Sequence, residues 1–234
     1  MAREKRVSTI CTKFEDEARA RGHRLVAGLD EVGRGALAGP VVAAAVILDP
    51  AAPLPEGLDD SKKLSPLQRE RIASELRRTA VCFSVGLVSH EEIDRTNILL
   101  ATRRAMTEAL KGLRPCAEFL LIDAVQLKES ELPQQSIIGG DSVSASIAAA
   151  SVIAKTFRDR LMRVFDQIHP GYGFAQHVGY GTRAHHSALR ERGPCRIHRR
   201  SFRGVLPEAS ADEATGIGAD ANAVERATAR ESEE

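Results

Sequence analysis

The sequence has few of the features that mark secreted or membrane-bound proteins. Its four cysteines lie far apart and form neither a CxxC pair nor a cysteine–histidine spacing of the zinc-finger kind. No apolar run approaches the roughly 18 residues of a membrane-spanning helix, and the polar, mostly charged stretch 1–24 does not resemble a signal peptide. We therefore expect free thiols, a cytoplasmic location and no contact with a membrane.

Several common catalytic signatures are missing as well. The chain has no internal repeat and no G-x-S-x-G motif, which argues against a serine nucleophile. Its first glycine turn does not continue as G-x-G-x-x-G, because residue 38 is alanine, so a Rossmann-like nucleotide-binding enzyme is not favoured. The spacing of His177, His185 and His186 matches no usual zinc site.

The small net charge of +1 hides an uneven distribution along the chain. Residues 208–234 carry eight acidic and two basic side chains and almost no large apolar ones. Such a segment cannot offset its ordering entropy, so we predict a disordered acidic tail. Residues 1–207 carry 31 basic and 24 acidic side chains, and this basic body favours a polyanionic partner.

The length of 234 residues and the hydrophobic content of 43% suit one α/β domain with appendages. Short apolar runs predict strands at 25–32, 40–48, 81–88, 119–122 and 135–139. Amphipathic or small-faced segments predict helices at 13–21, 66–79, 98–113 and 144–168. The nearly continuous apolar run at 40–48 is typical of a strand that is buried on both faces.

Carboxylates stand at or near the ends of three of these strands. Asp30 and Glu31 close the first strand, and Asp123 and Asp141 follow two later ones. Functional groups of an α/β sheet gather at the C-terminal edge of its parallel strands. Two carboxylates about 4 Å apart repel by roughly 4 kcal/mol at an effective dielectric near 20, so a cluster of them favours hard divalent cations. Two such ions about 4 Å apart stabilise the attacking and leaving oxygens of a phosphoryl displacement.

The first carboxylate pair is followed by a glycine-flanked arginine. Because neighbours on a straight strand point to opposite faces, Asp30 and Glu31 can share a metal only if the strand bends. Gly33 and Gly35 make a bend expected just afterwards. Arg34 can contact a phosphate bidentately, although a plain tight turn explains this Gly-Arg-Gly equally well.

Three further residues could contact nucleic acid. Lys62 and Lys63 precede an expected helix and could bind a polyanion, or could simply be solvated. Tyr180 lies between two glycines, where its ring could stack on a sugar and its hydroxyl could read a 2′-hydroxyl. Packing of this ring on the core is the alternative. A binding module without catalysis also stays open; it would explain the basic body but not the carboxylates, which repel phosphate in the absence of metal.

Taken together, these stretches resemble the bacterial ribonuclease HII family, the type 2 ribonucleases H. The resemblance covers most of residues 25–204. It is carried by AGLDEVGRGALAGPVVAAAVIL, DDSKKLS, LLID, GGDSVSASIAAASVIAKTFRDRLM, YGFAQHVGYGT and HRRSF. It implies a ribonuclease H-like α/β fold, with a five-stranded mixed sheet flanked by helices and a C-terminal helical extension.

The resemblance also implies a function. Members hydrolyse the RNA strand of RNA–DNA hybrids with Mg²⁺ or Mn²⁺, and incise duplex DNA 5′ of single embedded ribonucleotides, leaving 3′-hydroxyl and 5′-phosphate ends. The implied metal ligands and catalytic residues are Asp30, Glu31, Asp123 and Asp141. The implied contacts at the ribonucleotide junction are Gly33, Arg34, Gly35 and Tyr180. Asp159 is a weaker candidate, since on a continuous helix from Ser144 it lies about 20 Å from the helix start.

The resemblance divides the chain into four parts. We expect a polar helical segment at 1–24, a catalytic core at 25–168, a substrate-binding helical extension at 169–207 and the tail at 208–234, in a monomer. Two positions depart from the family pattern, because Gly140 and Val178 stand where lysine is common. We expect these departures to weaken or redistribute phosphate contacts.

Overall fold

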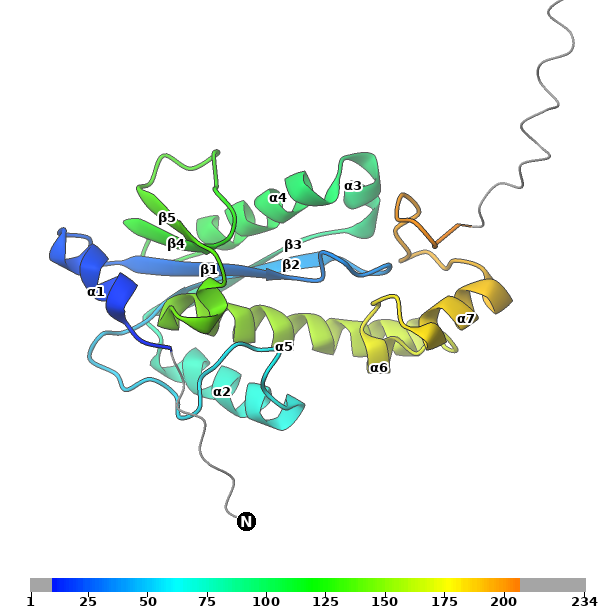
Figure 1. Cartoon of the computed structure of the whole chain (residues 1–234), viewed down its shortest axis with the longest axis horizontal. Helices are drawn as coiled ribbons and strands as arrows, with labels where there is room; N and C mark the ends of the chain where they lie inside the picture. Colours follow the sequence, from blue (N-terminus) through cyan, green and yellow to red (C-terminus); the bar gives the residue numbers. More distant parts are fainter. Residues whose placement is uncertain (1–9, 207–234) are drawn as a thin grey trace, which may run out of the picture.

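A five-stranded mixed sheet forms the centre of the chain (Figure 1). The computed structural model describes residues 10–206, so the predicted acidic tail at 208–234 lies outside the described residues. The strands lie in the order β3-β2-β1-β4-β5. Their bounds are Val26–Val32 for β1, Val41–Ile47 for β2, Cys82–Val88 for β3, Phe119–Asp123 for β4 and Gln134–Ile137 for β5.

Strand direction brings the acidic residues to one edge of this sheet. β1 is antiparallel to β2, and β2 is antiparallel to β3, whereas β4 and β5 run parallel to β1. The C-terminal ends of β1, β4 and β5 therefore share an edge, as the sequence predicts. All seven residues of β2 are buried, which confirms the expectation of a strand covered on both faces.

Helices cover both faces of the sheet. α4 (Ile98–Lys111) packs on one face, and α5 (Ala145–Ile168) crosses the other, with α2 (Pro66–Thr79) alongside α5 (Figure 1). The alanine-rich first half of α5 packs tightly on β1. A Cβ added to Gly28 would lie 2.1 Å from the carbonyl carbon of Ser146, so only glycine permits this approach.

Short helices complete the ends of the molecule. α1 (Lys13–Ala20) packs near β1 and β4, and the 3₁₀ turn η1 (Gly140–Ser142) precedes α5. The sequence did not predict α3 (His90–Arg95), a six-residue polar helix capped by the side chain of Ser89. None of the helices in the described part of the chain is long and apolar enough to span a membrane.

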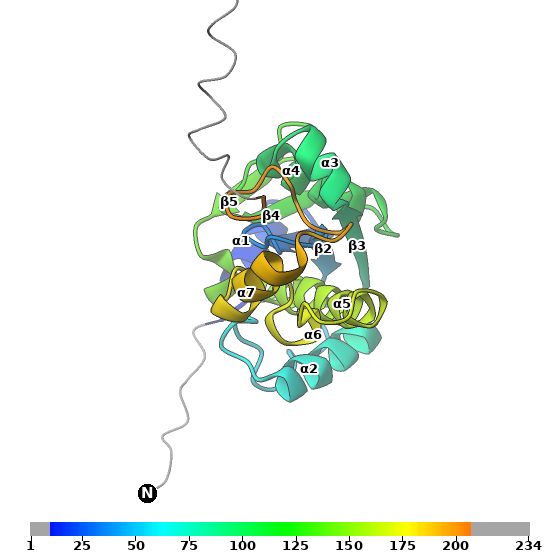
Figure 2. The same ribbon diagram turned by 90° about the vertical axis from the view of Figure 1, so that its right-hand side faces the viewer.

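The C-terminal extension contains α6 (Phe174–His177) and α7 (Arg183–Arg192) and lies beyond the end of the sheet (Figure 2). Isolated β-bridges join it to the turn that follows β1. One bridge pairs Ala36 with Tyr180, and a second pairs Ala38 with His198. The extension is thereby attached directly beside the acidic edge of the sheet.

Candidate active site

Asp30 lies on the central strand and is the most deeply buried acid of the predicted set. Only 4% of the residue is exposed. Its Oδ1 accepts the backbone N–H of Glu31 at 2.7 Å, and Ser151 on α5 lines the same cavity beside it. Burial raises the pKa of Asp30 well above its usual value, and the charges of Glu31 and Asp123 raise it further.

The neighbouring Glu31 and Asp123 belong to the same electrostatic cluster. Burial raises the pKa of Glu31, although its ion pair with Arg34, at 3.1 Å, opposes the change. Burial also raises the pKa of Asp123, whose Oδ1 accepts the N–H of Gly140 at 2.7 Å. Asp123 ends β4 and influences both acids of β1, so the parallel strands do bring these carboxylates together.

Asp141 is held by a lysine from another part of the chain. It lies buried in η1, where its Oδ2 accepts from Lys62 Nζ at 2.9 Å. Lys62 Nζ is also 3.9 Å from Asp60. Although burial lowers the pKa of Lys62, the contact with Asp141 raises it above its usual value. Lys62 is thus the cation that faces the acidic edge, whereas Lys63 pairs with Asp59 at 3.0 Å, away from Asp141.

The donor set fits a hard divalent cation. The four predicted ligands offer only carboxylate oxygens, and burial raises the pKa of Asp30, Glu31 and Asp123, so it disfavours the ionised state that a cation would stabilise. Each carboxylate is turned to a protein donor, and within residues 10–206 no three acid, histidine or cysteine side chains converge as a metal site. Binding of metal therefore requires these side chains to exchange partners.

The glycine turn and Tyr180 lie beside the carboxylates. Gly33 adopts a φ of +91°, which places the predicted bend directly after β1. Arg34 and Gly35 are exposed, and the backbone of residues 36 and 37 is joined to residues 179 and 180. The Tyr180 ring lies 5.6 Å from the guanidinium carbon of Arg158. Tyr180 therefore lines the site and is not packed away in the core.

A cavity of about 320 Å³ lies between the two acids of β1 and Tyr180, and neither Asp123 nor Asp141 lines it. It is lined by Asp30, Glu31, Val32, Ser61, Lys62, Ser151, Lys155 and Tyr180. Sequence reasoning assigned no role to the two serines or to Lys155. The Ser61 and Ser151 hydroxyls lie 2.8 Å apart, so they link the loop that carries Lys62 to α5 beside Asp30. Both serines lie within stretches that resemble the family, but no spacing rule marks them.

Asp159 takes part in an ion-pair network one helical turn beyond Lys155. Its carboxylate accepts from Lys155 Nζ at 2.7 Å and lies 3.5 Å from Arg69. It does not line the cavity with Asp30. The two departures from the family pattern also have local settings. A Cβ added to Gly140 would lie 2.5 Å from Ile147 Cδ1, and Val178 adopts a positive φ of 46°, unusual for a β-branched residue.

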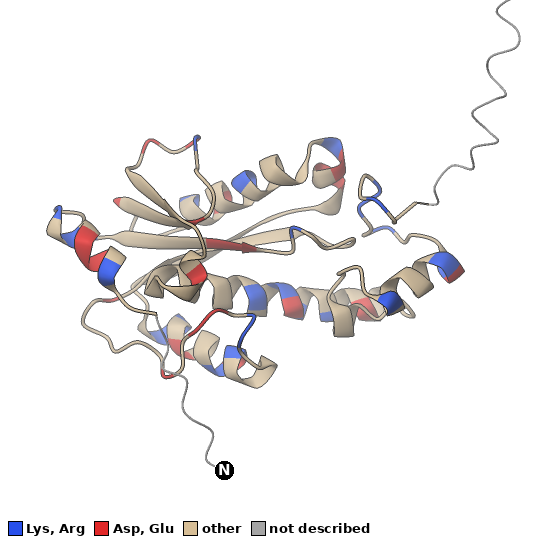
Figure 3. Cartoon of the chain, viewed as in Figure 1, with Lys and Arg blue, Asp and Glu red and all other residues tan. Residues whose placement is uncertain are grey.

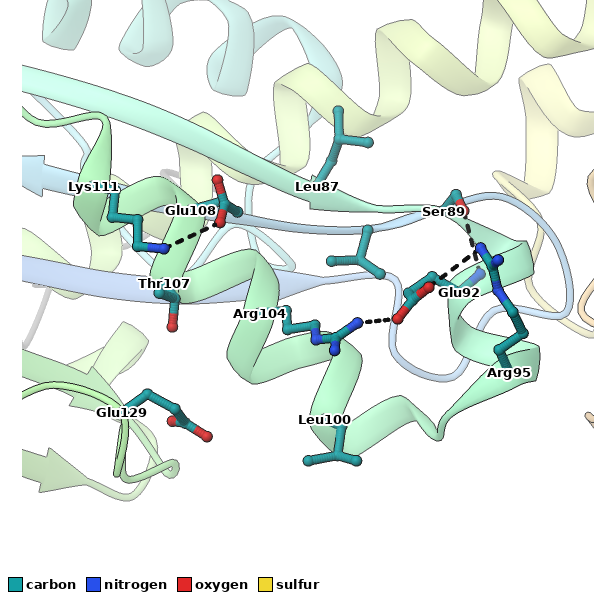
Figure 4. A pocket seen from close by; sticks show the side chains of 11 residues that line it. Leu87, Ser89, Glu92, Arg95, Leu100, Arg104, Thr107, Glu108, Lys111 and Glu129 are labelled. Carbon is teal, nitrogen blue, oxygen red and sulfur yellow. Dashed lines mark hydrogen bonds and ion pairs between the residues drawn. The ribbon is translucent and has the colours of Figure 1, made fainter.

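Acidic and basic residues are distributed unevenly over the elements of the fold. Figure 3 shows acidic positions on β1 at the centre of the chain, and Lys and Arg positions along α5 and on the C-terminal extension. A larger hollow of about 890 Å³ lies elsewhere, between α3, α4 and the end of β3 (Figure 4). There Glu92 pairs with Arg95 and Arg104, and Glu108 pairs with Lys111. The smaller cavity is the better candidate site because it is lined by the buried Asp30, whose pKa is raised well above its usual value, whereas these acids of the larger hollow are paired with exposed cations.

A five-stranded mixed sheet flanked by helices, with carboxylates on the central strand β1, at the end of β4 and just after β5, places the chain in the ribonuclease H-like class of folds. The sequence profile of ribonuclease HII matches residues 27–205. The chain therefore belongs to the ribonuclease HII family, whose members are endoribonucleases.

Curated relatives support this membership. Ribonuclease HII of Geobacter sulfurreducens is 53% identical over 192 residues, which cover 82% of this chain and 88% of that protein. Ribonuclease HII of Geobacillus kaustophilus is 53% identical over 201 residues, which cover 86% of this chain and 76% of that protein. The family identified from the sequence is confirmed.

Solved structures confirm the fold. Ribonuclease H2 of Pyrococcus horikoshii has a TM-score of 0.64 at 28% identity, covering 77% of this chain and 94% of that one. Ribonuclease HII of Archaeoglobus fulgidus, solved in complex with PCNA, has a TM-score of 0.67 at 27% identity, covering 81% of this chain and 99% of that one. The ribonuclease H-like fold expected from the sequence is therefore the fold of this chain.

Proposed function

We propose that this endoribonuclease incises duplex DNA on the 5′ side of a single embedded ribonucleotide, as well as cutting the RNA strand of RNA–DNA hybrids. The products would carry 3′-hydroxyl and 5′-phosphate ends. Membership of the family supports activity on hybrids. The observation that carries the finer proposal is the shared cavity, because Asp30 and Glu31 line it together with Tyr180.

Asp30, Glu31, Asp123 and Asp141 would hold the divalent ions, with Mg²⁺ or Mn²⁺ as the ions used. When bound, such ions activate a water molecule and stabilise the charge on the leaving oxygen. The chain prepares this set by holding Asp30 Oδ1 at the N–H of Glu31, with Ser151 beside it in the cavity. Gly140 N–H likewise fixes Asp123.

The remaining residues would recognise the strand. Arg34 is exposed and pairs with Glu31 at 3.1 Å. From this position its guanidinium could bind a phosphate beside the acidic edge. Tyr180 offers a ring and a hydroxyl next to that edge, which suits a test for the 2′-hydroxyl of a ribonucleotide. Lys62 would approach the backbone near Asp141, and Lys63 would contribute only general positive charge.

One assay tests this function directly. Duplex DNA with a single ribonucleotide, and the same duplex with deoxyribonucleotides only, are incubated with the protein with and without Mg²⁺ or Mn²⁺. We expect a metal-dependent nick 5′ of the ribonucleotide, with ends that a DNA polymerase can extend, and no cut in the all-DNA duplex. Binding without any nick would support the non-catalytic module and contradict the proposal.

A further inference from the structure

Two arginines lie fully buried behind the glycine turn without an acidic partner. Arg158 on α5 and Arg199 in the C-terminal extension are both 0% exposed. Across residues 10–206, no carboxylate oxygen lies within 4.0 Å of either guanidinium. Both bind backbone carbonyls of the loop at residues 34–40 instead, and Arg158 also reaches the C-terminal extension. Arg158 donates to the carbonyls of Ala38, Pro40 and Val178, and Arg199 donates to those of Arg34 and Gly39.

Arg199 keeps this position at a cost to stability. Its Nη2 is buried and has no hydrogen-bond partner among the described residues. A buried donor without a partner costs free energy, and well-packed apolar residues often replace buried charges without loss of stability. Burial and the charge of Arg158 also lower the pKa of the Arg199 guanidinium. The arginine is therefore poorly explained as a device for stability alone.

The bond from Arg199 to the turn fixes the direction of one peptide group. Arg199 Nη1 donates to the carbonyl of Arg34 at 2.8 Å, so this carbonyl points inward. In a trans peptide the carbonyl and the following N–H point in opposite directions. The N–H of Gly35 consequently points away from the buried guanidinium. Gly35 is exposed, a Cβ added to it would meet no atom within 4 Å, and its N–H bonds to no group in the described chain.

Arg158 joins the same turn to Tyr180. A Cβ added to Gly33 would lie 2.2 Å from Arg158 Nε, so the turn rests directly on this guanidinium. The same side chain bonds to the carbonyl of Val178 at 2.8 Å and lies against the Tyr180 ring. Arg158 and Arg199 therefore bind carbonyls of the same loop, residues 34–40, which runs from Gly35 past the β-bridge to Tyr180.

We infer that Arg199 is a positioning residue for ribonucleotide recognition: its fork holds the Arg34 carbonyl inward and thereby presents the Gly35 N–H to an oxygen of the bound strand. This inference rests on the proposed function, because it assigns the oxygen to the ribonucleotide. The part played by Arg199 is indirect, since the side chain is buried and touches no substrate.

The test compares Arg199→Lys with the wild-type chain. Lysine keeps the positive charge but lacks the guanidinium that donates to both the Arg34 and the Gly39 carbonyls. We expect kcat for incision to fall about 10- to 100-fold, as when a reacting group is misplaced by about 1 Å. Affinities are then measured with Ca²⁺ in place of Mg²⁺, with the duplex checked to be uncut. The preference for the single-ribonucleotide duplex over the all-DNA duplex should fall, while the affinity for the all-DNA duplex is retained.

A matched control lies at the other end of the sheet. Arg114 also donates to two backbone carbonyls, those of Lys111 and Leu113. Arg114→Lys should leave both kcat and the preference unchanged. An unchanged preference in Arg199→Lys, or equal weakening of both duplexes, would overturn the inference. A wild-type chain that shows no preference for the ribonucleotide would instead overturn the proposed function itself.

A second variant removes the N–H that Arg199 presents. Gly35→Pro lacks the backbone donor, and a Cβ at this position meets no atom within 4 Å. It should lose the preference as Arg199→Lys does, and the double variant should lose little more than either single variant, because both changes affect one contact. If Arg199→Lys does not fold, Gly35→Pro decides alone: a retained preference would refute the inference, and a lost preference would support it.

Discussion

Two buried histidines behind Tyr180 should make the stability of this protein depend on pH. His185 and His198 are fully buried, and their Nε2 atoms lie 3.0 Å apart. The N–H of Cys195 donates to His198 Nδ1 at 2.9 Å, and His185 Nδ1 lies 3.0 Å from the carbonyl of Tyr180. These partners are satisfied when both rings are neutral, with His198 donating to His185 and His185 donating to Tyr180.

The size of the effect follows from the pKa values. Burial lowers the pKa of His185 to about 4, and burial and the neighbouring His185 lower the pKa of His198 to about 4. An unfolded histidine titrates near 6.5, so the unfolded chain binds more protons between these values and stability falls as the pH falls. Between about pH 7 and about pH 5, each histidine should lower the free energy of unfolding by on the order of 2 kcal/mol. If the two titrations are coupled, the pair together lowers it by less than twice that amount.

Urea unfolding at these two pH values measures the effect. Asp30, Glu31 and Asp123 act in the opposite direction, because their raised pKa values favour the folded state as the pH falls. The loss of unfolding free energy that is due to the histidines is therefore obtained by comparing wild type with a His185→Gln/His198→Gln double variant. We expect the double variant to lose less stability on acidification. Equal losses in the two proteins would refute the reasoning.

Two other substitutions test the helix start and the acidic edge. Glu15 is fully buried and accepts from the hydroxyls of Ser144 and Ser146 at the start of α5. Glu15→Gln should therefore lower the free energy of unfolding by about 1–3 kcal/mol in urea titration. The same substitution at the exposed Glu17 should not, and equal effects of the two would contradict this assignment. Lys62→Met should tighten Mn²⁺ binding to the free protein by up to about fivefold in calorimetry, since it removes the ion pair between the exposed Lys62 ammonium and buried Asp141, worth about 1 kcal/mol. Lys63→Met is its control, and weaker binding in Lys62→Met would show that the ammonium does not compete with metal.

Most of the fold could be predicted from the sequence because the signals are local. Apolar runs bounded by glycine, proline or charge located all five strands to within about two residues, and β2 is the clearest case. Ser65 caps α2 with a complete capping box, as its place before Pro66 indicates. α3 was missed because six residues with a single apolar side chain, Ile93, are too short to show a helical period.

The site could be predicted only in part, because its details depend on contacts between distant residues. Strand-end acids were visible in the sequence, and their convergence follows from parallel strands. The roles of Ser151, Lys155 and Arg199 were not visible, since each depends on which backbone or carboxylate lies opposite in space. Alternation on β1 does not prevent Asp30 and Glu31 from lining one cavity, because both lie close to the turn at Gly33.

The most direct test of the account is the substitution Asp30→Asn in the single-ribonucleotide assay. Asparagine keeps the shape and can still accept from the N–H of Glu31, but it removes the charge that would hold a divalent ion. We predict that incision with Mg²⁺ or Mn²⁺ is lost while the variant still binds the hybrid, and that the distant control Asp16→Asn cuts normally. Incision by Asp30→Asn at the wild-type rate would contradict the central claim that this acidic edge is the active site.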